Sequence, residues 1–591
     1  MTRPLRERRS LFLIPLAALF VVHPLIVHGC SCGHDFDFHL LNWMEAANQI
    51  AHGNLHPHWA YTPAFNAGEP RFVFYPPISW YVGALLGFLL THLAGISEAA
   101  GWNAAPILFT WIALTLSGLT MHRLAREYAS ANAALLAAIL YLANPYMLFT
   151  AFERTAYAEL LAAAWIPLLL LSILRERITL PGVAVPVALL WLTNAPAAIM
   201  GTYTLAFLAV VRVVTNPGAP EPALSLPKGL ASQTWESRHE GTSQLALRIL
   251  AGTALGLALA AFYLIPAIYQ RRYVQIAMAT IAGMKIDQNF LFEHTGTSSD
   301  QLLHDAVLHT ASVIALILFI ATAIALAAIA ARRARVSFPT LPLTILTAAI
   351  AFLLTPWSAS LWTHAPEAAL LQFPWRLLAI LAPVLALAIA FLLSSHSPGA
   401  PSLTVDWVGR NATTAKLLAI AALAALILPV YHLFRQPCDP EDTAPARLAL
   451  FHSNTGTDPT DEYTPTTADN DALTPNNPPY WLAGSPEAAA PAGATPGPAP
   501  THLALAAPRP QVLILNLRDY PAWRIARNGV AVAPTEFEDR PDGLIAIPMP
   551  AGPSTVDIHY AHTLDQTLGD AISLIALVLL LITRLKSPSR S

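Results

Sequence analysis

Long apolar runs alternate with short polar segments along most of this chain of 591 residues. Because a helix needs roughly 20 apolar residues to cross a bilayer, each long run predicts one membrane span. The runs lie near residues 11–29, 103–121, 131–149, 158–174, 179–194, 197–214, 247–268, 307–330, 339–355, 374–394, 416–433 and 569–583. The pattern predicts an all-α polytopic membrane protein with about twelve spans.

One further apolar stretch, Pro76–Gly95, is ambiguous. Short loops rich in arginine and lysine stay in the cytoplasm, so they decide the topology. If the N-terminus is cytoplasmic and Pro76–Gly95 dips into the membrane without crossing, all these loops face the cytoplasm, whereas a crossing would turn nearly all of them outward. They carry Arg123 and Arg126, Arg175 and Arg177, Arg332, Arg333 and Arg335, Arg410 and Lys416, and Arg584, Lys586 and Arg590. We therefore predict one membrane-dipping helix and two cytoplasmic termini.

On this topology five segments face away from the cytoplasm: 30–75, 150–157, 269–306, 356–373 and 434–568. We expect the chain to divide into four parts. These are a transmembrane domain (1–433), a Pro/Ala-rich extracytoplasmic linker (434–510), an extracytoplasmic β module (511–568), and a last span with a basic cytoplasmic tail (569–591).

The pattern of the segment before the last span changes near Gln511. Residues 464–510 are rich in Pro, Ala, Thr and Asn, which is typical of a linker or irregular loop. After them, apolar residues recur with period two, and Asn528-Gly529 is a strong hairpin signal. Short strands are predicted at 512–517, 523–526, 544–547 and 556–560. These features predict a small β-sandwich before the last span.

Composition agrees with a membrane protein and excludes some other classes. Hydrophobic residues make up 55% of the chain and charged residues 12%, against about 25% charged residues in a soluble domain. The net charge of −3 gives no electrostatic case for binding nucleic acid. We expect a multi-pass protein of a bacterial-type plasma membrane, with its active face outside the cytoplasm.

The first span and the cysteines leave two alternatives open. Leu11–Val27 follows four arginines as in a signal peptide, and Val27-His28-Gly29-Cys30 faintly resembles a lipoprotein cleavage site. An uncleaved span is favoured because His28 fits such a site poorly. Cys30, Cys32 and Cys438 all fall on the predicted outer face, where a disulfide persists. One bridge with one thiol left over is expected, and its pairing is open.

Candidate chemistry is concentrated directly after the first span, in His34-Asp35-Phe36-Asp37-Phe38-His39. Ionisable groups beside a bilayer are functional candidates by default. The acids and aromatic residues alternate, which places the polar side chains toward water and the rings toward lipid or protein. An amphipathic interfacial helix is predicted to follow over residues 40–50.

These motifs resemble the GT-C superfamily, whose members are polytopic glycosyltransferases that use polyprenyl-phosphate-linked sugars. The acidic motif, Gly-Asn-Leu-His-Pro-His-Trp, Phe-Tyr-Pro-Pro and Gln372-Phe373-Pro374-Trp375-Arg376 are similar to the bacterial and archaeal membrane family labelled "6-pyruvoyl-tetrahydropterin synthase-related". Tyr520-Pro521-Ala522-Trp523-Arg524 and Ile572-Ser573-Leu574 resemble the related YfhO-like proteins. The resemblance extends from about residue 30 to residue 575, and its pterin label implies no pterin chemistry here.

The resemblance implies that an acidic residue of the first outer loop deprotonates the acceptor hydroxyl. Asp35 is the first choice because the family pattern places a histidine four residues after the acid, here His39, and Asp37 is the second. A carboxylate suits the role of general base. The structural alternative is that either acid only caps the following helix.

A departing phosphate requires compensating positive charge, and two arginines lie at the predicted outer boundary. Arg154 and Arg376 are therefore candidate phosphate ligands, with snorkelling toward lipid headgroups as the alternative. Glu153 and Glu159 are expected to pair with Arg154 or to help bind the acceptor. His34 and Tyr75 are further candidate substrate contacts, and Arg271 and Arg272 are weaker ones.

No cofactor is assigned, and a divalent metal is the less favoured reading of five histidines in the first outer loop. Their spacing lacks a two-ligand helical pattern: His34, His39, His52, His56 and His58. The expected partners are the bilayer, a polyprenyl-phosphate-linked sugar and a glycan, lipid or protein acceptor. A transporter of lipid-linked saccharide and a non-catalytic scaffold remain alternatives, since fold does not imply function.

Overall fold

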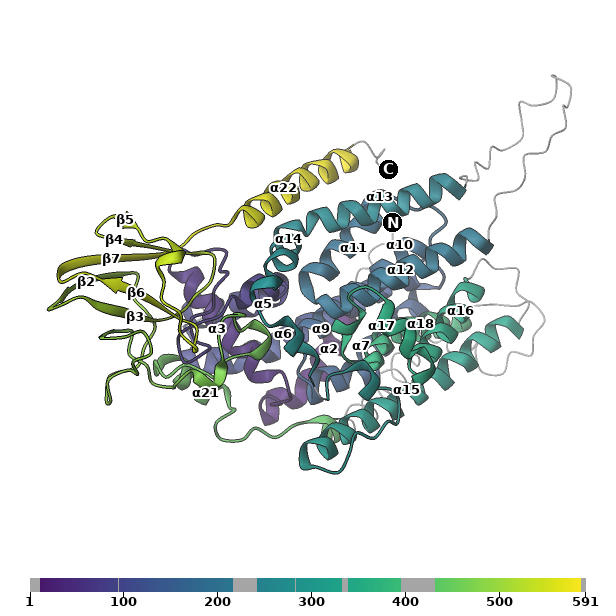
Figure 1. The fold of residues 1–591 in the computed structure, drawn as a ribbon. Helices are drawn as coiled ribbons and strands as arrows, with labels where there is room; N and C mark the ends of the chain where they lie inside the picture. The colour runs from purple at the N-terminus through teal and green to yellow at the C-terminus, as the bar shows by residue number, and fades with distance from the viewer. Residues whose placement is uncertain are drawn as a thin grey trace, which may run out of the picture.

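The computed structural model describes residues 11–93, 95–215, 242–281, 283–331, 339–394 and 431–585. Helices make up most of this part of the chain, and two small β-sheets lie at one end of the helical bundle (Figure 1). The helices are α2 Leu13–His28, α3 Phe36–Ala51, α4 Arg71–Phe74, α5 Pro77–Phe88, α6 Glu98–Ala125, α7 Ala131–Leu142, α8 Pro145–Leu148, α9 Tyr157–Ala162, α10 Ile166–Leu174, α11 Leu180–Thr193, α12 Ala195–Thr215, α13 Thr242–Leu259, α14 Ala261–Gln270, α15 Ser299–Ala331, α16 Thr340–Leu353, α17 Ala359–His364, α18 Leu378–Ser394, α21 Ala444–His452 and α22 Leu564–Leu585.

Short 3-10 and π turns connect several of these helices. They are η1 Leu89–Leu93, η2 Phe149–Glu153, η3 Arg271–Tyr273, η4 Ile276–Thr280, η5 Ile286–Gln288, η6 Pro356–Ser358, η7 Ala368–Leu371, η8 Pro374–Leu377, η9 Asp461–Tyr463, η10 Asn470–Ala472 and η11 Pro534–Glu536.

Within the described residues, seven helical segments are long and apolar enough to cross a membrane, or nine if two bent pairs each count as one span. About twelve spans were expected. The predicted spans 11–29 and 179–194 form α2 and α11, of 16 and 14 residues, so they rise only about 24 and 21 Å. That is less than the roughly 30 Å of the hydrocarbon core. Most of the predicted span 416–433 lies outside the described residues.

The ambiguous stretch Pro76–Gly95 folds as α5 followed by the π turn η1, again shorter than the seven long helices. Its glycines allow close packing. A Cβ on Gly83 would lie 2.1 Å from the ring of Trp43 in α3, and one on Gly87 would lie 2.2 Å from Trp102 in α6. The helix is therefore fitted between α3 and α6, and its dipping without crossing stays a prediction.

The β module consists of two antiparallel sheets. The three-stranded sheet has the order β1-β3-β6 and the four-stranded sheet the order β2-β7-β4-β5. The strands are β1 Tyr480–Ala483, β2 His502–Ala507, β3 Gln511–Arg518, β4 Trp523–Arg527, β5 Val530–Ala531, β6 Leu544–Met549 and β7 Gly552–Tyr560. Alternate residues of both sheets, among them Leu513, Ile547 and Ile558, share one hydrophobic core. The four strands predicted after Gln511 are present, and Asn528-Gly529 turns between β4 and β5 with positive φ at both residues.

The predicted linker also contributes structure to this module. Strands β1 and β2 and helix α21 all lie between residues 434 and 510, so reading that whole segment as linker is wrong. The strands are short and lie at sheet edges, where alanine-rich sequences give little periodicity. A second core on the other face of β3 and β6 includes Ala64 and Ala67 of the first outer loop. The module is thus packed against that loop rather than tethered apart from it.

Helix α22 leads from the module back along α13 and α14 (Figure 1). The chain bends by 75° between α13 and α14, and such a break leaves backbone groups without helical partners. Ser573 of α22 pairs with them: its Oγ accepts from the Phe262 N–H at 2.9 Å and donates to the Ala258 carbonyl at 3.2 Å. The bend directs the end of α14, with Arg271 and Arg272 after it, toward the cavity described next.

Candidate functional site

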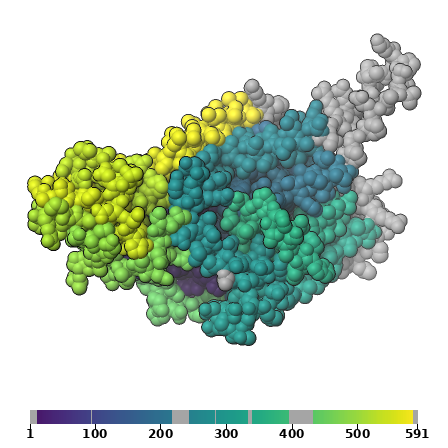
Figure 2. All heavy atoms as spheres, in the orientation of Figure 1, coloured from purple at the N-terminus to yellow at the C-terminus, as the bar shows by residue number. Residues whose placement is uncertain are grey.

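A single cavity of about 1710 Å³ collects residues from segments far apart in the sequence. All five segments predicted to share the outer face contribute to it, together with the turn between α11 and α12. Figure 2 shows a hollow on this side of the molecule in which N-terminal residues, in purple, are visible between the teal and green parts of the chain. A cavity of this size accommodates a ligand larger than a single sugar.

Asp35 lines this cavity, and its backbone is fixed by the chain that precedes α9. The Asp35 N–H donates to the Arg154 carbonyl at 3.0 Å, and Ser31 Oγ donates to the Phe152 carbonyl at 2.5 Å. Asp35 stands at the N-cap position of α3, yet its side chain makes no capping hydrogen bond. Helix capping therefore does not account for the carboxylate, although the positive end of the helix favours its charge.

Gly33 permits this docking. A Cβ at Gly33 would lie 2.2 Å from the Glu153 carbonyl oxygen, a backbone atom that cannot swing away. We expect Gly33→Ala to displace the Asp35 segment from the cavity wall and to lower the thermal stability. Gly484→Ala is the matched control, because no atom lies within 4 Å of a Cβ there. Equal thermal unfolding temperatures of the two variants would contradict the tight docking of this segment.

His39 and Tyr75 form an aromatic floor beside Asp35. The ring of His39 is buried and contacts Tyr75 and Tyr157 edge-on, at centroid distances of 5.8 and 5.4 Å. Burial lowers the pKa of His39 to about 4, which keeps the imidazole neutral near pH 7, and burial raises the pKa of Tyr75. His34 lines the cavity. By surface area this residue is exposed, but the surrounding protein partly desolvates its ring, and this desolvation lowers its pKa.

Beside these residues lies a buried cluster with an excess of positive charge. Arg154 Nη1 is 2.8 Å from Glu159 Oε2, and Arg376 Nε is 3.3 Å from the same oxygen. The Tyr146 hydroxyl donates to Glu159 Oε1 at 2.5 Å. Arg154, Glu159 and Arg376 are only 4, 4 and 8% exposed. Because one carboxylate pairs with two guanidinium groups, the cluster presents a net positive charge to the cavity.

Aromatic rings hold the two guanidinium groups in place. The Arg154 guanidinium lies 4.9 Å from the ring centre of Trp375, and that of Arg376 lies 4.9 Å from Phe373. Arg376 Nη1 also donates to the Leu371 carbonyl at 2.9 Å. Such contacts place the arginines in the protein wall, so snorkelling toward lipid headgroups does not describe them.

Two of the predicted site residues are not part of the cavity wall. Asp37 is half-exposed, and its Oδ2 lies 3.6 Å from Nη2 of Arg447 in α21. The alternating pattern predicted that Asp35 and Asp37 face one side, but α3 already begins at Phe36, so the two residues point in different directions. Glu153 ends the π turn η2, and Arg154 pairs with Glu159 instead.

The structure adds a cavity wall that the sequence did not indicate. Residues 459–463, here called the strap, come from the predicted linker and line the cavity with Asp461, Glu462 and Tyr463. A buried network fixes the strap, because Arg71 donates to Thr460 Oγ1 at 2.5 Å and Glu69 accepts from the Thr460 N–H at 2.6 Å. The pair of acids within a Pro/Thr-rich stretch is the one signal that could have marked it.

Three residues at or beside the cavity have a strained backbone conformation. Thr155, Glu367 and Gln372 have positive φ values of 47, 59 and 60°, and each costs of the order of 1–3 kcal/mol for a residue with a side chain. Glu367 and Gln372 line the cavity, while Thr155 directly follows Arg154. Such conformations cluster where function fixes the backbone.

Among the described residues, no group of three or more His, Cys, Asp and Glu side chains is placed to hold a metal ion. His34 and His39 lie at the cavity, whereas His56 and His58 lie near the end of β7. The five histidines of the first outer loop therefore do not meet in one place.

Protonation of His58 should make stability depend on pH. His58 stacks on Tyr560 and contacts His56 and His562, and burial together with these two imidazoles lowers its pKa from 6.5 to about 3. As the pH falls below 6.5 the unfolded chain takes up a proton that the native chain does not, so stability is lost at about 1.4 kcal/mol per pH unit. The negative charge of Asp570 opposes this effect at His56.

His58→Phe keeps the stacking and removes the titration. Thermal unfolding at pH 7.5 and pH 5.0 should show a smaller acid loss for this variant than for the wild type. An identical acid loss in both proteins would show that His58 does not cause the dependence.

Comparisons with known proteins give distant structural similarities. No family model and no curated protein matches the chain. Among solved structures, it is similar to the arabinofuranosyltransferase AftD from Mycobacteria, with 17% identity, a TM-score of 0.42, and coverage of 73% of this chain and 27% of AftD. It is also similar to the oligosaccharyltransferase AglB from Archaeoglobus fulgidus in complex with an inhibitory peptide and a dolichol-phosphate, with 15% identity, a TM-score of 0.39, and coverage of 74% and 57%.

A third similar structure is ArnT from Cupriavidus metallidurans bound to undecaprenyl phosphate, with 16% identity, a TM-score of 0.36, and coverage of 75% of this chain and 77% of ArnT. The chain spans less than two thirds of the length of AftD and AglB. At these scores the comparisons assign no residue and no activity. The chain therefore has distant structural similarity to these three proteins, and seven to nine of its described helical segments are long and apolar enough to cross a membrane.

Proposed function

We propose that this protein is a membrane glycosyltransferase that moves a sugar from a polyprenyl-phosphate-linked donor to an extracytoplasmic acceptor. The observation that carries the proposal is the meeting of Asp35 with the buried Arg154–Glu159–Arg376 cluster in one cavity. A carboxylate beside fixed positive charge is what attack by a hydroxyl and departure of a phosphate require together.

Asp35 is assigned the role of general base. Its carboxylate takes the proton of the acceptor hydroxyl while that oxygen forms a bond to the anomeric carbon of the sugar. The bond between the anomeric carbon and the phosphate oxygen breaks, and its electron pair leaves with the polyprenyl phosphate. His39 is neutral and buried beside Asp35, so it serves to shape the site rather than to carry charge.

Arg154 and Arg376 are assigned to the phosphate. Glu159 neutralises one of the two positive charges, and the remaining charge stabilises the negative charge that develops on the leaving phosphate. The side chains of the cluster are buried, and charge interactions in a protein interior are stronger than those at a surface. His34 and Tyr75 complete the donor side of the cavity in this proposal, and the strap forms its acceptor side.

The wider assignments follow from the same proposal. The segment 434–568 forms a wall and a cover on the acceptor side of the cavity. The cavity faces the extracytoplasmic side of a bacterial-type plasma membrane. Membership of the pterin-synthase-related membrane family rests on the motifs named above. A divalent metal has no assigned role in this mechanism.

Comparative profiling of glycans and lipid-linked sugars tests the function. A deletion strain should lack one glycan and accumulate its polyprenyl-phosphate-linked sugar, and the wild-type gene should restore both. The side of the membrane on which the donor accumulates separates an enzyme from a transporter, because a transporter defect leaves the donor on the cytoplasmic face, where added glycosidases cannot reach it. Unchanged glycans and lipid-linked sugars in the deletion strain would favour the scaffold reading.

A further inference from the structure

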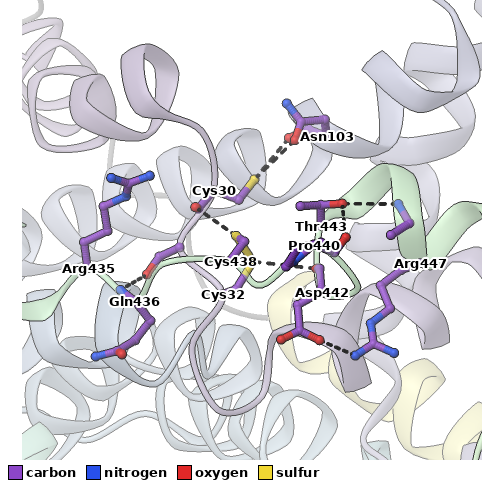
Figure 3. The surroundings of a disulfide bond; sticks show 12 residues. Cys30, Cys32, Asn103, Arg435, Gln436, Cys438, Pro440, Asp442, Thr443 and Arg447 are labelled. Atoms are coloured by element: carbon purple, nitrogen blue, oxygen red, sulfur yellow. Dashed lines mark hydrogen bonds and ion pairs between the residues drawn. A yellow bond between two sulfur atoms is a disulfide. The ribbon is translucent and has the colours of Figure 1, made fainter.

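A disulfide bond joins Cys32 to Cys438, and Cys30 is the free cysteine (Figure 3). The bond connects the segment that enters the acidic motif with a segment 406 residues later in the chain. Cys32 stands three residues before Asp35. The covalent link therefore lies at the edge of the proposed site.

Hydrogen bonds reinforce the contact between these two segments. The Cys32 N–H donates to the Gln436 carbonyl at 3.2 Å, and the Gln436 N–H donates to Ser31 Oγ at 2.9 Å. Cys438 Sγ lies 3.5 Å from the Cys30 carbonyl. Residues 436–438 thus lie along residues 30–32 and hold them from one side.

The same short segment is also held by the chain before α9. Ser31 Oγ donates to the Phe152 carbonyl, and the Asp35 N–H donates to the Arg154 carbonyl. Ser31 thereby takes part in both contacts, because its Oγ accepts from Gln436 and donates to Phe152. Loosening of residues 436–438 should therefore reach Ser31 first and Asp35 next.

We propose that the Cys32–Cys438 disulfide is a redox-sensitive clamp that positions Asp35 against Arg154 in the cavity wall. This inference deepens the proposed function, because it assigns covalent control to the position of the proposed base. Reduction of the clamp leaves the fold intact and frees residues 31–35.

The chemistry of the step is a thiol–disulfide exchange with a dithiol. The S–S bond breaks, two electrons and two protons pass from the dithiol to the cysteine pair, two thiols form, and the dithiol becomes its own disulfide. Both cysteines are partly exposed, so a small dithiol reaches them. Cys30 takes no part. Burial raises the pKa of its thiol to about 12, and its Sγ points toward Asn103, away from the bridge (Figure 3).

Hydrogen–deuterium exchange of the full-length protein in detergent tests the clamp without any assay of activity. The oxidised protein is compared with protein reduced by dithiothreitol and with the Cys32→Ser/Cys438→Ser double variant. We expect the amide of Asp35 to exchange at least tenfold faster in the last two samples, while peptides of β3 stay protected. Cys30→Ser is the matched control, and it should exchange like the wild type.

Two results would overturn the clamp. One is an unchanged exchange rate at Asp35 after verified reduction. The other is faster exchange throughout the molecule, β3 included, which would make the bridge a general staple.

Binding of undecaprenyl phosphate to the same samples separates this inference from the proposed function. If the oxidised protein binds undecaprenyl phosphate no better than undecaprenol, the proposed function fails, and hydrogen exchange still decides the clamp. If the oxidised protein prefers the phosphate, we expect at least a threefold weaker affinity after reduction and no change in Cys30→Ser. Equal affinity before and after reduction would overturn the link between the clamp and the site.

Discussion

Replacing Asp35 with asparagine should reduce sugar transfer by about 100- to 10,000-fold while the protein is still made and inserted. This range is the usual contribution of one positioned general base. Asparagine keeps the size of the side chain and the backbone hydrogen bond to Arg154, so the cavity wall should stay intact. The measurement is the rate at which the missing glycan reappears in the complemented deletion strain, with membrane levels of the protein compared by immunoblot.

Asp37→Asn provides the matched control for this prediction. Asp37 stands two residues further along the chain, but it is half-exposed and faces Arg447 instead of the cavity. Its loss removes a weak surface ion pair, so transfer should stay within about twofold of wild type. Normal transfer by Asp35→Asn would remove Asp35 from the mechanism, and loss of transfer in Asp37→Asn alone would move the base to the other acid.

The choice between these two acids shows what a local sequence pattern cannot predict. The motif reads as an alternation of acids and aromatic rings, which in an extended chain places both acids on one face. In the structure α3 starts at Phe36, so residues four apart share a face. Asp35 and His39 therefore line the cavity together, and Asp37 turns away. The family pattern places a histidine four residues after the acid, and this spacing brings both side chains to one face of a helix.

Local signals predicted the features that depend on neighbouring residues. The strands after Gln511 and the Asn528-Gly529 turn follow from alternation and turn chemistry, and they are present. Strands β1 and β2 were missed because their residues pair with partners tens of residues away and carry little pattern of their own. The same limit applies to the strap, whose position depends on Arg71 and Glu69.

The sequence predicted one part of the Arg154–Glu159–Arg376 cluster and missed another part. The pairing of Arg154 with Glu159 was one of the options that the sequence analysis left open. Nothing in the sequence indicated that Arg376, more than 200 residues later, would approach the same carboxylate oxygen. Bringing these three groups together requires the packing of α9 against distant helices, which no short motif encodes.

Removing the charge of Glu159 should therefore destabilise the protein strongly. In Glu159→Gln the side chain keeps its shape, but Arg154 and Arg376 are left buried without a neutralising carboxylate. Breaking a buried ion pair on one side costs about 3–5 kcal/mol. We expect a loss of this size in the free energy of unfolding, measured by denaturant titration in detergent micelles.

Glu367→Gln is the matched control, because Glu367 also pairs with an arginine at the same cavity. Its bond to Arg271 is 3.0 Å long, but both side chains are 44% exposed, and such pairs contribute only about 0–1 kcal/mol. If the cluster binds phosphate, undecaprenyl phosphate should recover part of the stability of Glu159→Gln, since a ligand that binds only the native state stabilises it. Equal losses in the two variants would mean that Glu159 does not balance the two arginines. If undecaprenyl phosphate does not stabilise the Glu159→Gln protein, the proposed binding of phosphate to this cluster is wrong.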